Sequence, residues 1–516
     1  MAETGDVVET VKQGYAFEGA AIELGALLVD GEPKPDAAVR IPLAMVNRHG
    51  LVAGATGTGK TKTLQLMAEQ LSAAGVAVFA ADIKGDLSGV SQPGEGNDKL
   101  LARTKSIGQD WTASGFPTEF YALGGQGTGI PIRATITSFG PVLLSKVLGL
   151  NDVQESSLGL IFHYADKAGL TLLDLKDLRS VITHLTSEEG KDDLKELGGL
   201  SAATAGVILR SLIGFADQGA EAFFGEPEFD TADLMQERDG KGVISLLELP
   251  NLQDRPALFS TFLMWLLADL FHDLPEVGDV DKPKLVFFFD EAHLLFADAS
   301  KAFLSAIAQT VRLIRSKGVG VFFVTQTPKD VPDDVLAQLG SRVQHQLRAH
   351  TPNDAKALKA TVSTFPSSSY DLGEVLTQLG IGEAIVTVMN EKGAPTPVAW
   401  TRLRAPQSLM APASAEQMTA AVQASPHNAK YSQTIDRESA YEILAAKVQA
   451  GAEQAQAEEQ AKQQQQQQQE APRPRAQKQE KSMVEQVVGS SAFKQFARTA
   501  GREIVRGLFG AARKRR

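Results

Sequence analysis

The sequence predicts an α/β fold built on a mainly parallel sheet. Three apolar runs, Val76–Ala80, Leu285–Phe289 and Gly318–Val324, have the length and composition of strands that are buried on both faces. Segments with apolar residues at helical spacing lie between them. Strands that alternate with helices are typical of a parallel sheet, because a crossover helix returns the chain to the same edge.

We expect a small β element at the start of the chain, over residues 1–48. Apolar runs at Ala20–Val29 and Ala37–Met45 flank the turn-rich sequence Asp30-Gly31-Glu32-Pro33-Lys34-Pro35. Gly and Pro between two apolar runs indicate strands joined by a turn.

A complete phosphate-binding loop follows, with the pattern G-x-x-x-x-G-K-[ST] over residues 54–61. Glycines let backbone N–H groups close around phosphate oxygens, Lys60 reaches the β- and γ-phosphates, and the Thr61 hydroxyl ligates Mg²⁺. A short apolar run precedes the loop and a helical segment follows it, so the phosphates would lie at a helix N-terminus. The sequence therefore predicts a site for ATP and Mg²⁺. Its candidate nucleotide-binding residues are Gly54, Ala55, Thr56, Gly57, Thr58, Gly59, Lys60, Thr61 and Lys62.

Polar residues follow two of the apolar runs and predict hydrolysis. Asp290 and Glu291 end the first run, where the carboxyl ends of parallel strands form the ligand crevice. We expect Asp290 to hold Mg²⁺ and Glu291 to polarise the attacking water as general base. Gln326 ends the next run and is a candidate sensor of the γ-phosphate. The alternative for Gln326 is that it only caps the following turn.

The rest of the α/β core is interrupted by a leucine-rich helical segment with few β-branched runs. Further strands are expected at Val243–Leu247, Arg342–Arg348, Glu383–Met389 and Pro397–Leu403, and a helix at Ala257–Leu274. The expected parts are thus the first part of the core at 49–135, a helical insertion at 136–238 and the second part of the core at 239–410.

Composition excludes several classes of site. The chain has no Cys, which excludes disulfides, zinc–thiolate sites and thiol catalysis. Its first residues are polar and acidic, unlike a signal peptide. The longest nearly apolar stretch, Ala257–Ala268, is too short to cross a membrane. We therefore expect a cytoplasmic protein without a transmembrane segment.

The end of the chain has a composition of its own. We expect a helical and Gln-rich linker at 411–482, which includes the glutamine run Gln463–Gln469, and a basic amphipathic helix at 483–516. Residues 471–516 hold 12 Lys and Arg against 3 Glu, a net +9. Residues 1–470 therefore carry −20, which together give the −11 of the whole chain. A basic helix of this kind can contact an anionic membrane, a phosphate backbone or a protein partner, or simply be solvated.

Several stretches together resemble one known family. Asn47-Arg48-His49-Gly50 leads into the phosphate loop, and the sequences VFFFDEAHLL at 286–295 and IRSKGVGVFFVTQTP at 314–328 follow. With DIKGDLSG at 82–89, these stretches are similar to the HerA-like branch of the FtsK/HerA P-loop ATPases, and most similar to its bacterial YjgR-type subgroup. The resemblance covers about residues 15–410.

The resemblance implies a RecA-like P-loop fold that assembles into a homo-oligomer, usually a hexameric ring, with ATP at the interfaces. It implies action on double-stranded DNA, often beside a nuclease or another protein partner. Arg48 matches the family position of an arginine that reaches the neighbouring subunit's nucleotide, and Arg315 matches an arginine that senses nucleotide state. Arg342 and Arg348 are further interface candidates.

Two classes of function remain open from the sequence. The first is a ring-forming, DNA-dependent ATPase that acts as a translocase or helicase. The second is an ATP-driven assembly or scaffold protein that acts on a protein or membrane partner, which the acidic body favours slightly. A small-molecule kinase fits less well, because Glu291 beside Asp290 suits water activation better than transfer to an acceptor.

Overall fold

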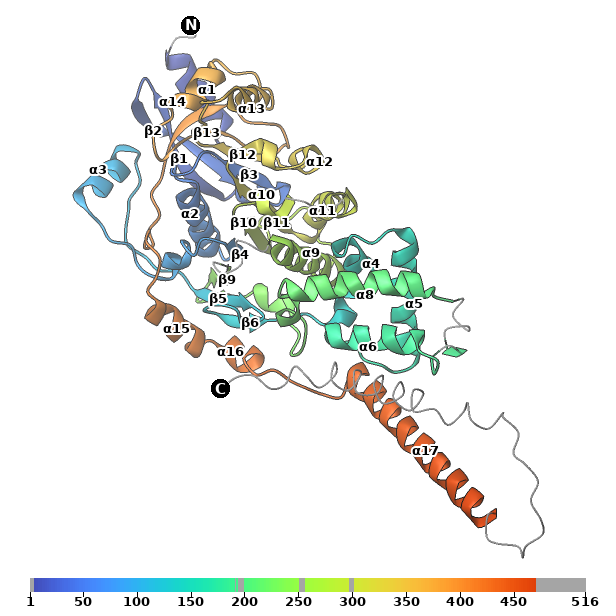
Figure 1. The fold of residues 1–516 in the computed structure, drawn as a ribbon. Helices are drawn as coiled ribbons and strands as arrows, with labels where there is room; N and C mark the ends of the chain where they lie inside the picture. Colours follow the sequence, from blue (N-terminus) through green and yellow to red (C-terminus); the bar gives the residue numbers. More distant parts are fainter. Residues whose placement is uncertain (1–3, 191, 194–198, 250–255, 297–300, 470–516) are drawn as a thin grey trace, which may run out of the picture. The chain divides into compact units, whose positions relative to one another are not determined.

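The three apolar runs form neighbouring strands of one large sheet (Figure 1). The computed structural model describes residues 4–190, 192–193, 199–249, 256–296 and 301–469. Within these ranges, no helix is both long enough and apolar enough to span a membrane. Across the 12-stranded sheet the order is β2 (Glu32–Pro42), β1 (Ala21–Val29), β14 (Ala399–Leu403), β13 (Glu383–Thr387), β12 (Ser341–Gln344), β3 (Gly50–Ala53), β11 (Val319–Thr325), β10 (Leu285–Phe289), β4 (Ala77–Asp82), β9 (Ile244–Glu248), β5 (Thr118–Leu123) and β6 (Ile130–Ile132).

The sheet is parallel from β12 to β6 and antiparallel from β13 to β2. The predicted α/β fold with a mainly parallel sheet is therefore confirmed. Strands β1 and β2 are joined by a turn at Asp30 and Gly31, both with positive φ. They extend the core sheet by pairing with β14, and helix α1 (Thr4–Gly14) precedes them.

Helices cover both faces of the parallel part, which explains why its strands are apolar throughout. Phe287 and Phe289 of β10 pack in one core with α9 (Pro256–Asp273) and α11 (Lys301–Ile314). Phe288 points to the opposite face and packs in a second core with α2 (Lys60–Ala73). All three rings are fully buried, and each contributes about 1.5–3 kcal/mol through burial.

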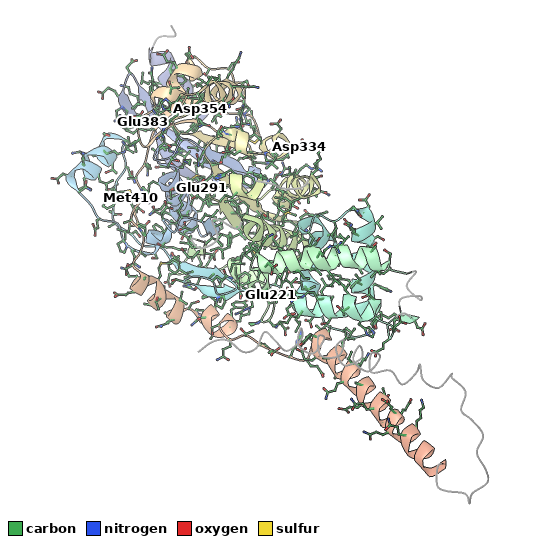
Figure 2. All side chains as sticks on the ribbon, viewed as in Figure 1. Glu221, Glu291, Asp334, Asp354, Glu383 and Met410 are labelled. Carbon is green, nitrogen blue, oxygen red and sulfur yellow. The ribbon has the colours of Figure 1, made fainter. Side chains whose placement is uncertain are left out.

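Four longer helices form the segment between β6 and β9: α4 (Ile136–Val147), α5 (Asp152–Lys167), α6 (Leu175–Thr186) and α8 (Ala202–Asp217). Asn151, Asp174 and Ser201 each accept a backbone N–H at the start of α5, α6 and α8, as capping residues do. The apolar faces of these helices continue the core that contains α9. Figure 2 labels Glu221 beside this helical segment and Glu291 within the sheet region.

The described part of the C-terminal segment contains three helices. Helices α15 (Ala415–Ala424) and α16 (Pro426–Tyr431) follow the sheet, and Tyr431 and Leu444 are buried in the core. Helix α17 (Ala440–Gln469) continues through the glutamine run, within the segment where we expected a helical and Gln-rich linker. Glutamine is among the better helix formers, so the run extends the helix. The core unit ends at Lys447 and a second unit begins at Val448. The predicted basic helix at 483–516 lies outside the described residues.

Candidate active site

The phosphate loop connects β3 to α2, as the pattern predicts. Gly54 and Gly59 have φ values of 157° and 110°, which favour glycine. A Cβ on Gly54 would lie only 2.4 Å from the Cβ of His345. The Thr58 hydroxyl and the Lys60 ammonium donate to Ala55 O at 2.8 and 3.1 Å, which closes the loop. Thr56 and Gly57 are exposed at its tip.

The first turn of α2 is open to an anion. Its capping residue is Gly59, which has no side chain to accept the first N–H groups, and the turn holds no acidic residue. Free N–H groups at the positive end of a helix bind phosphate. Thr61 lies in this turn, and the Lys62 ammonium donates to Gln65 at 3.1 Å. Burial lowers the pKa of Lys60, while the Glu291 carboxylate opposes this change.

A buried histidine that the sequence did not single out supports the loop. Strand β12 ends at Gln344 and not at the predicted Arg348. After Gln344 the backbone pairs with the phosphate loop instead of a strand, since Ala55 N donates to Gln346 O at 2.8 Å. His345 Nδ1 donates to Thr58 O at 3.1 Å, and its Nε2 lies 2.9 Å from the Thr63 hydroxyl. Burial lowers the pKa of His345 to about 4, so the ring is neutral at pH 7. The position of His345 directly after a strand is the sequence signal that could have indicated its place in the nucleotide site.

Asp290 and Glu291 lie at the carboxyl end of β10, and their environments differ. Asp290 is buried; its Oδ1 accepts the Glu291 N–H at 2.9 Å, and its Oδ2 has no partner among the described residues. Burial, and then the charge of Glu291, raise the pKa of Asp290 to about 7. A buried carboxylate oxygen without a donor fits a cation, so Asp290 and Thr61 are suitable residues to hold Mg²⁺. When bound, Mg²⁺ offsets the negative charge of the phosphates.

Glu291 lies between Lys84 and His293. Its backbone has a φ of 47°. Its Oε1 forms an ion pair with Lys84 Nζ, and its Oε2 lies 3.2 Å from His293 Nδ1, outside good hydrogen-bond alignment. His293 and then Lys84 lower the pKa of Glu291 to about 2, although burial opposes them. Neither Lys84 nor His293 has a role predicted from the sequence. Lys84 follows β4, the neighbour of β10, so its place beside Glu291 required the strand order.

Gln326 directly follows β11, between the phosphate loop and the carboxylates in strand order. It lines a cavity of about 300 Å³ together with Ala55, Thr56 and Arg348. The Arg348 guanidinium donates to Thr56 O at 3.2 Å, so Arg348 contacts the loop of its own chain.

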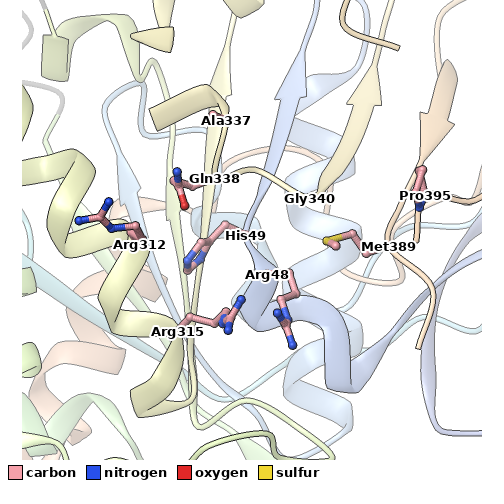
Figure 3. Close-up of a pocket in the computed structure, with 9 residues that line it drawn as sticks. All are labelled: Arg48, His49, Arg312, Arg315, Ala337, Gln338, Gly340, Met389 and Pro395. Carbon is pink, nitrogen blue, oxygen red and sulfur yellow. The ribbon is translucent and has the colours of Figure 1, made fainter. Parts of the chain in front are cut away.

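Arg48 and Arg315 lie at the opposite edge of the sheet from the phosphate loop, where the parallel strands begin. Arg48 precedes β3 and Arg315 precedes β11, whereas the phosphate loop and Gln326 follow these strands. The seven residues of β11 separate the two edges by about 23 Å. Both arginines line a cavity of about 470 Å³, shown in Figure 3. Arg342 is the second residue of β12 and lies near this edge, opposite Leu51 of β3.

The cavity between the arginines is rich in positive charge. It is also lined by Arg312, His49 and Gln338 (Figure 3). Arg48 Nη2 pairs with the exposed carboxylate of Asp279 at 3.2 Å. His49 is buried and its Nδ1 accepts the Val321 N–H at 3.0 Å, which ties the segment of Arg48 to β11. The structure thus groups Arg48 with Arg315 and separates both from the phosphate loop of the same chain.

Comparison with known proteins identifies the family. The family described as helicase HerA-like C-terminal matches residues 28–516. The chain belongs to this family. It is therefore a P-loop ATPase that uses ATP and Mg²⁺. The finer placement of this HerA-like chain in a YjgR-type subgroup stays a prediction.

Two relatives carry the name DNA double-strand break repair helicase HerA. The protein of Sulfurisphaera tokodaii is 22% identical over 375 residues, which cover 72% of this chain and 67% of the relative. That of Saccharolobus solfataricus is 22% identical over 383 residues, which cover 73% and 68%. Among solved structures, the plasmid coupling protein TrwB in complex with the ATP analogue ADPNP has a TM-score of 0.51 at 18% identity, covering 79% of this chain and 94% of TrwB. The RecA-like fold implied for this HerA-like chain is confirmed.

Proposed function

We propose that this HerA-like chain is an ATP-driven motor that acts on double-stranded DNA, as a translocase or helicase. We further propose that it works as a homo-oligomeric ring of six subunits, as the family resemblance implies, with each ATP site shared between two subunits. Membership of the HerA-like family supports the motor function, and two relatives are named as DNA repair helicases.

The observation that carries the shared site is the position of the arginines. Phosphoryl transfer in P-loop enzymes is accelerated when an arginine neutralises charge that develops on the γ-phosphate. Arg48 and Arg315 lie at the amino edge of β3 and β11, a strand length away from the loop of their own chain. A second subunit that places this edge against the phosphate loop would supply the missing charge.

Each remaining part of the site has a role in this proposal. Lys60 and the open turn of α2 bind the phosphates, and Thr61 and Asp290 hold Mg²⁺. Glu291 orients and polarises the attacking water, and Gln326 reports the presence of the γ-phosphate. Arg348 contacts Thr56 of its own loop, so we assign it to the same subunit as that loop.

The motor function is tested by the ATPase rate with and without double-stranded DNA. We expect duplex DNA to raise the rate at low salt, and the effect to weaken steeply with added salt, because the release of counterions from the DNA backbone is less favourable in a more concentrated salt solution. Heparin is the control, since a response to any polyanion would not require a duplex. No response to DNA at low salt would contradict the proposal and favour an ATP-driven scaffold with a protein or membrane partner.

A further inference from the structure

Ile381 is the most exposed large apolar side chain among the residues that the structure describes, with 77% of its surface accessible. It lies in the turn between α14 (Leu372–Gln378) and β13. An exposed isoleucine at the surface of a loop is unremarkable by itself. Its position beside the phosphate loop is what requires an explanation.

The turn of Ile381 is fixed to the phosphate loop. The next residue, Gly382, donates its N–H to Thr58 O at 3.2 Å, and its N lies 3.5 Å from the position of a Cβ on Gly59. Gly382 O accepts from Arg103 Nη2 at 2.8 Å and from Leu403 N at 2.9 Å. These hydrogen bonds fix the backbone of Gly382, and therefore the position of its neighbour Ile381, directly beside the phosphate loop.

The strand order shows which side of the loop Ile381 occupies. Strands β11 and β10, which carry Gln326 and Asp290, lie on one side of β3. Strands β12 and β13 lie on the other side. Because β13 is antiparallel to β12, its first residues lie at the same edge as the phosphate loop. Ile381 and the carboxylates are therefore at the same edge, on opposite sides of the loop.

A nucleotide bound here has its γ-phosphate toward the carboxylates, where Lys60, Mg²⁺ and Glu291 act. A nucleoside that extends away from the carboxylates would leave the loop on the opposite side, which is the side of Ile381. We propose that Ile381 is the apolar platform against which the base of the nucleotide packs. This inference rests on the ATP site of the proposed function and adds a residue that positions the base.

The test compares ATP with inorganic tripolyphosphate, which has the phosphates but no base, in binding assays with Mg²⁺ and the full-length chain. Ile381→Ser should weaken ATP binding about tenfold, because it removes apolar area that the base would cover. It should leave tripolyphosphate binding unchanged. Ile381→Leu keeps the apolar area and should bind ATP like the parent.

Ile435→Ser is the matched control, since Ile435 is also exposed, at 53%, and its backbone pairs with Glu226 instead of the phosphate loop. It should change neither affinity. Equal losses for ATP and tripolyphosphate, or no loss for ATP, would overturn the base platform. A change in subunit assembly without a base-dependent loss would also overturn it, and would place Ile381 at a subunit contact. If the parent binds neither ligand, the proposed function itself fails.

Discussion

At the scale of single residues, the pKa values of two adjacent carboxyl groups, Asp290 and Glu291, are shifted in opposite directions. Burial raises the pKa of Asp290 to about 7, and a cation would favour its ionised form. His293 and Lys84 lower the pKa of Glu291 to about 2, so this group stays ionised at every pH at which enzymes usually work. Opposite pKa directions in neighbouring groups are typical of an acid–base site. Here they agree with the proposed roles of Asp290 as a ligand of Mg²⁺ and of Glu291 as the group that orients water.

This division predicts the effect of two variants on turnover. Glu291→Gln should keep ATP bound and lower the hydrolysis rate by roughly 10²–10⁴, the usual effect of removing a general base. Lys84→Met should lower the hydrolysis rate by a smaller factor, because a glutamate with an ordinary pKa of about 4.3 is still ionised at pH 7. Steady-state ATPase rates and ATP affinity for both variants provide the measurement. Hydrolysis at the parental rate in Glu291→Gln would show that another group activates water.

At the scale of elements, the phosphate loop depends on the strand beside it. The loop is bonded to the segment after β12 through Ala55 and through His345, which is buried and contacts Thr58 and Thr63. Those bonds join residues more than 280 positions apart in the sequence. The conformation of the loop is thus set by the packing of β12 on β3 as well as by its own glycines.

Replacing this histidine should therefore affect binding and not only stability. We expect His345→Ala to lower the free energy of unfolding by about 1–3 kcal/mol through two lost hydrogen-bond contacts, and to weaken ATP binding about tenfold because the loop is less well fixed. His427→Ala is the matched control: His427 is also buried, and it contacts Tyr121 and Gln236. It should lower thermal stability and leave ATP affinity unchanged. Similar affinity losses in both variants would indicate a general effect of destabilisation.

At the scale of the whole molecule, Arg48 and Arg315 lie a strand length away from the phosphate loop of their own chain. The phosphate loop and carboxylates lie at the carboxyl edge of the parallel strands, and the cavity of Arg48, Arg312 and Arg315 lies at the amino edge. One molecule therefore presents the phosphate loop and the arginine cavity at opposite ends of its parallel strands. If identical subunits assemble with these two ends in contact, as in a closed ring, the arginines of one subunit would lie beside the phosphate loop of the next.

Mixing variants tests this arrangement. Arg48→Ala should bind ATP but hydrolyse it slowly, and Lys60→Ala should fail to bind it. In a mixture, some interfaces pair an intact loop with an intact Arg48, so part of the activity should return. Each variant alone at the same total concentration is the control. Full ATPase activity from a monomer at nanomolar concentration would contradict the shared site.

The sequence by itself determined the α/β class, the phosphate loop and the carboxylate pair. These features are local: the loop pattern is contiguous, and Asp290 and Glu291 directly follow an apolar run that has the length and composition of a buried strand. Chemistry that depends on residues adjacent in the chain can be recognised without knowing how distant segments meet.

Only the tertiary structure decided which distant side chains complete the site. Lys84 and Glu291 are 207 positions apart, and they meet because β4 and β10 are neighbours in the sheet. His345 supports the loop because β12 lies beside β3, and Arg348 contacts its own loop for the same reason. The separation of Arg48 and Arg315 from the phosphates likewise follows from strand direction. Strand order and direction arise from packing between remote segments, which no local pattern encodes.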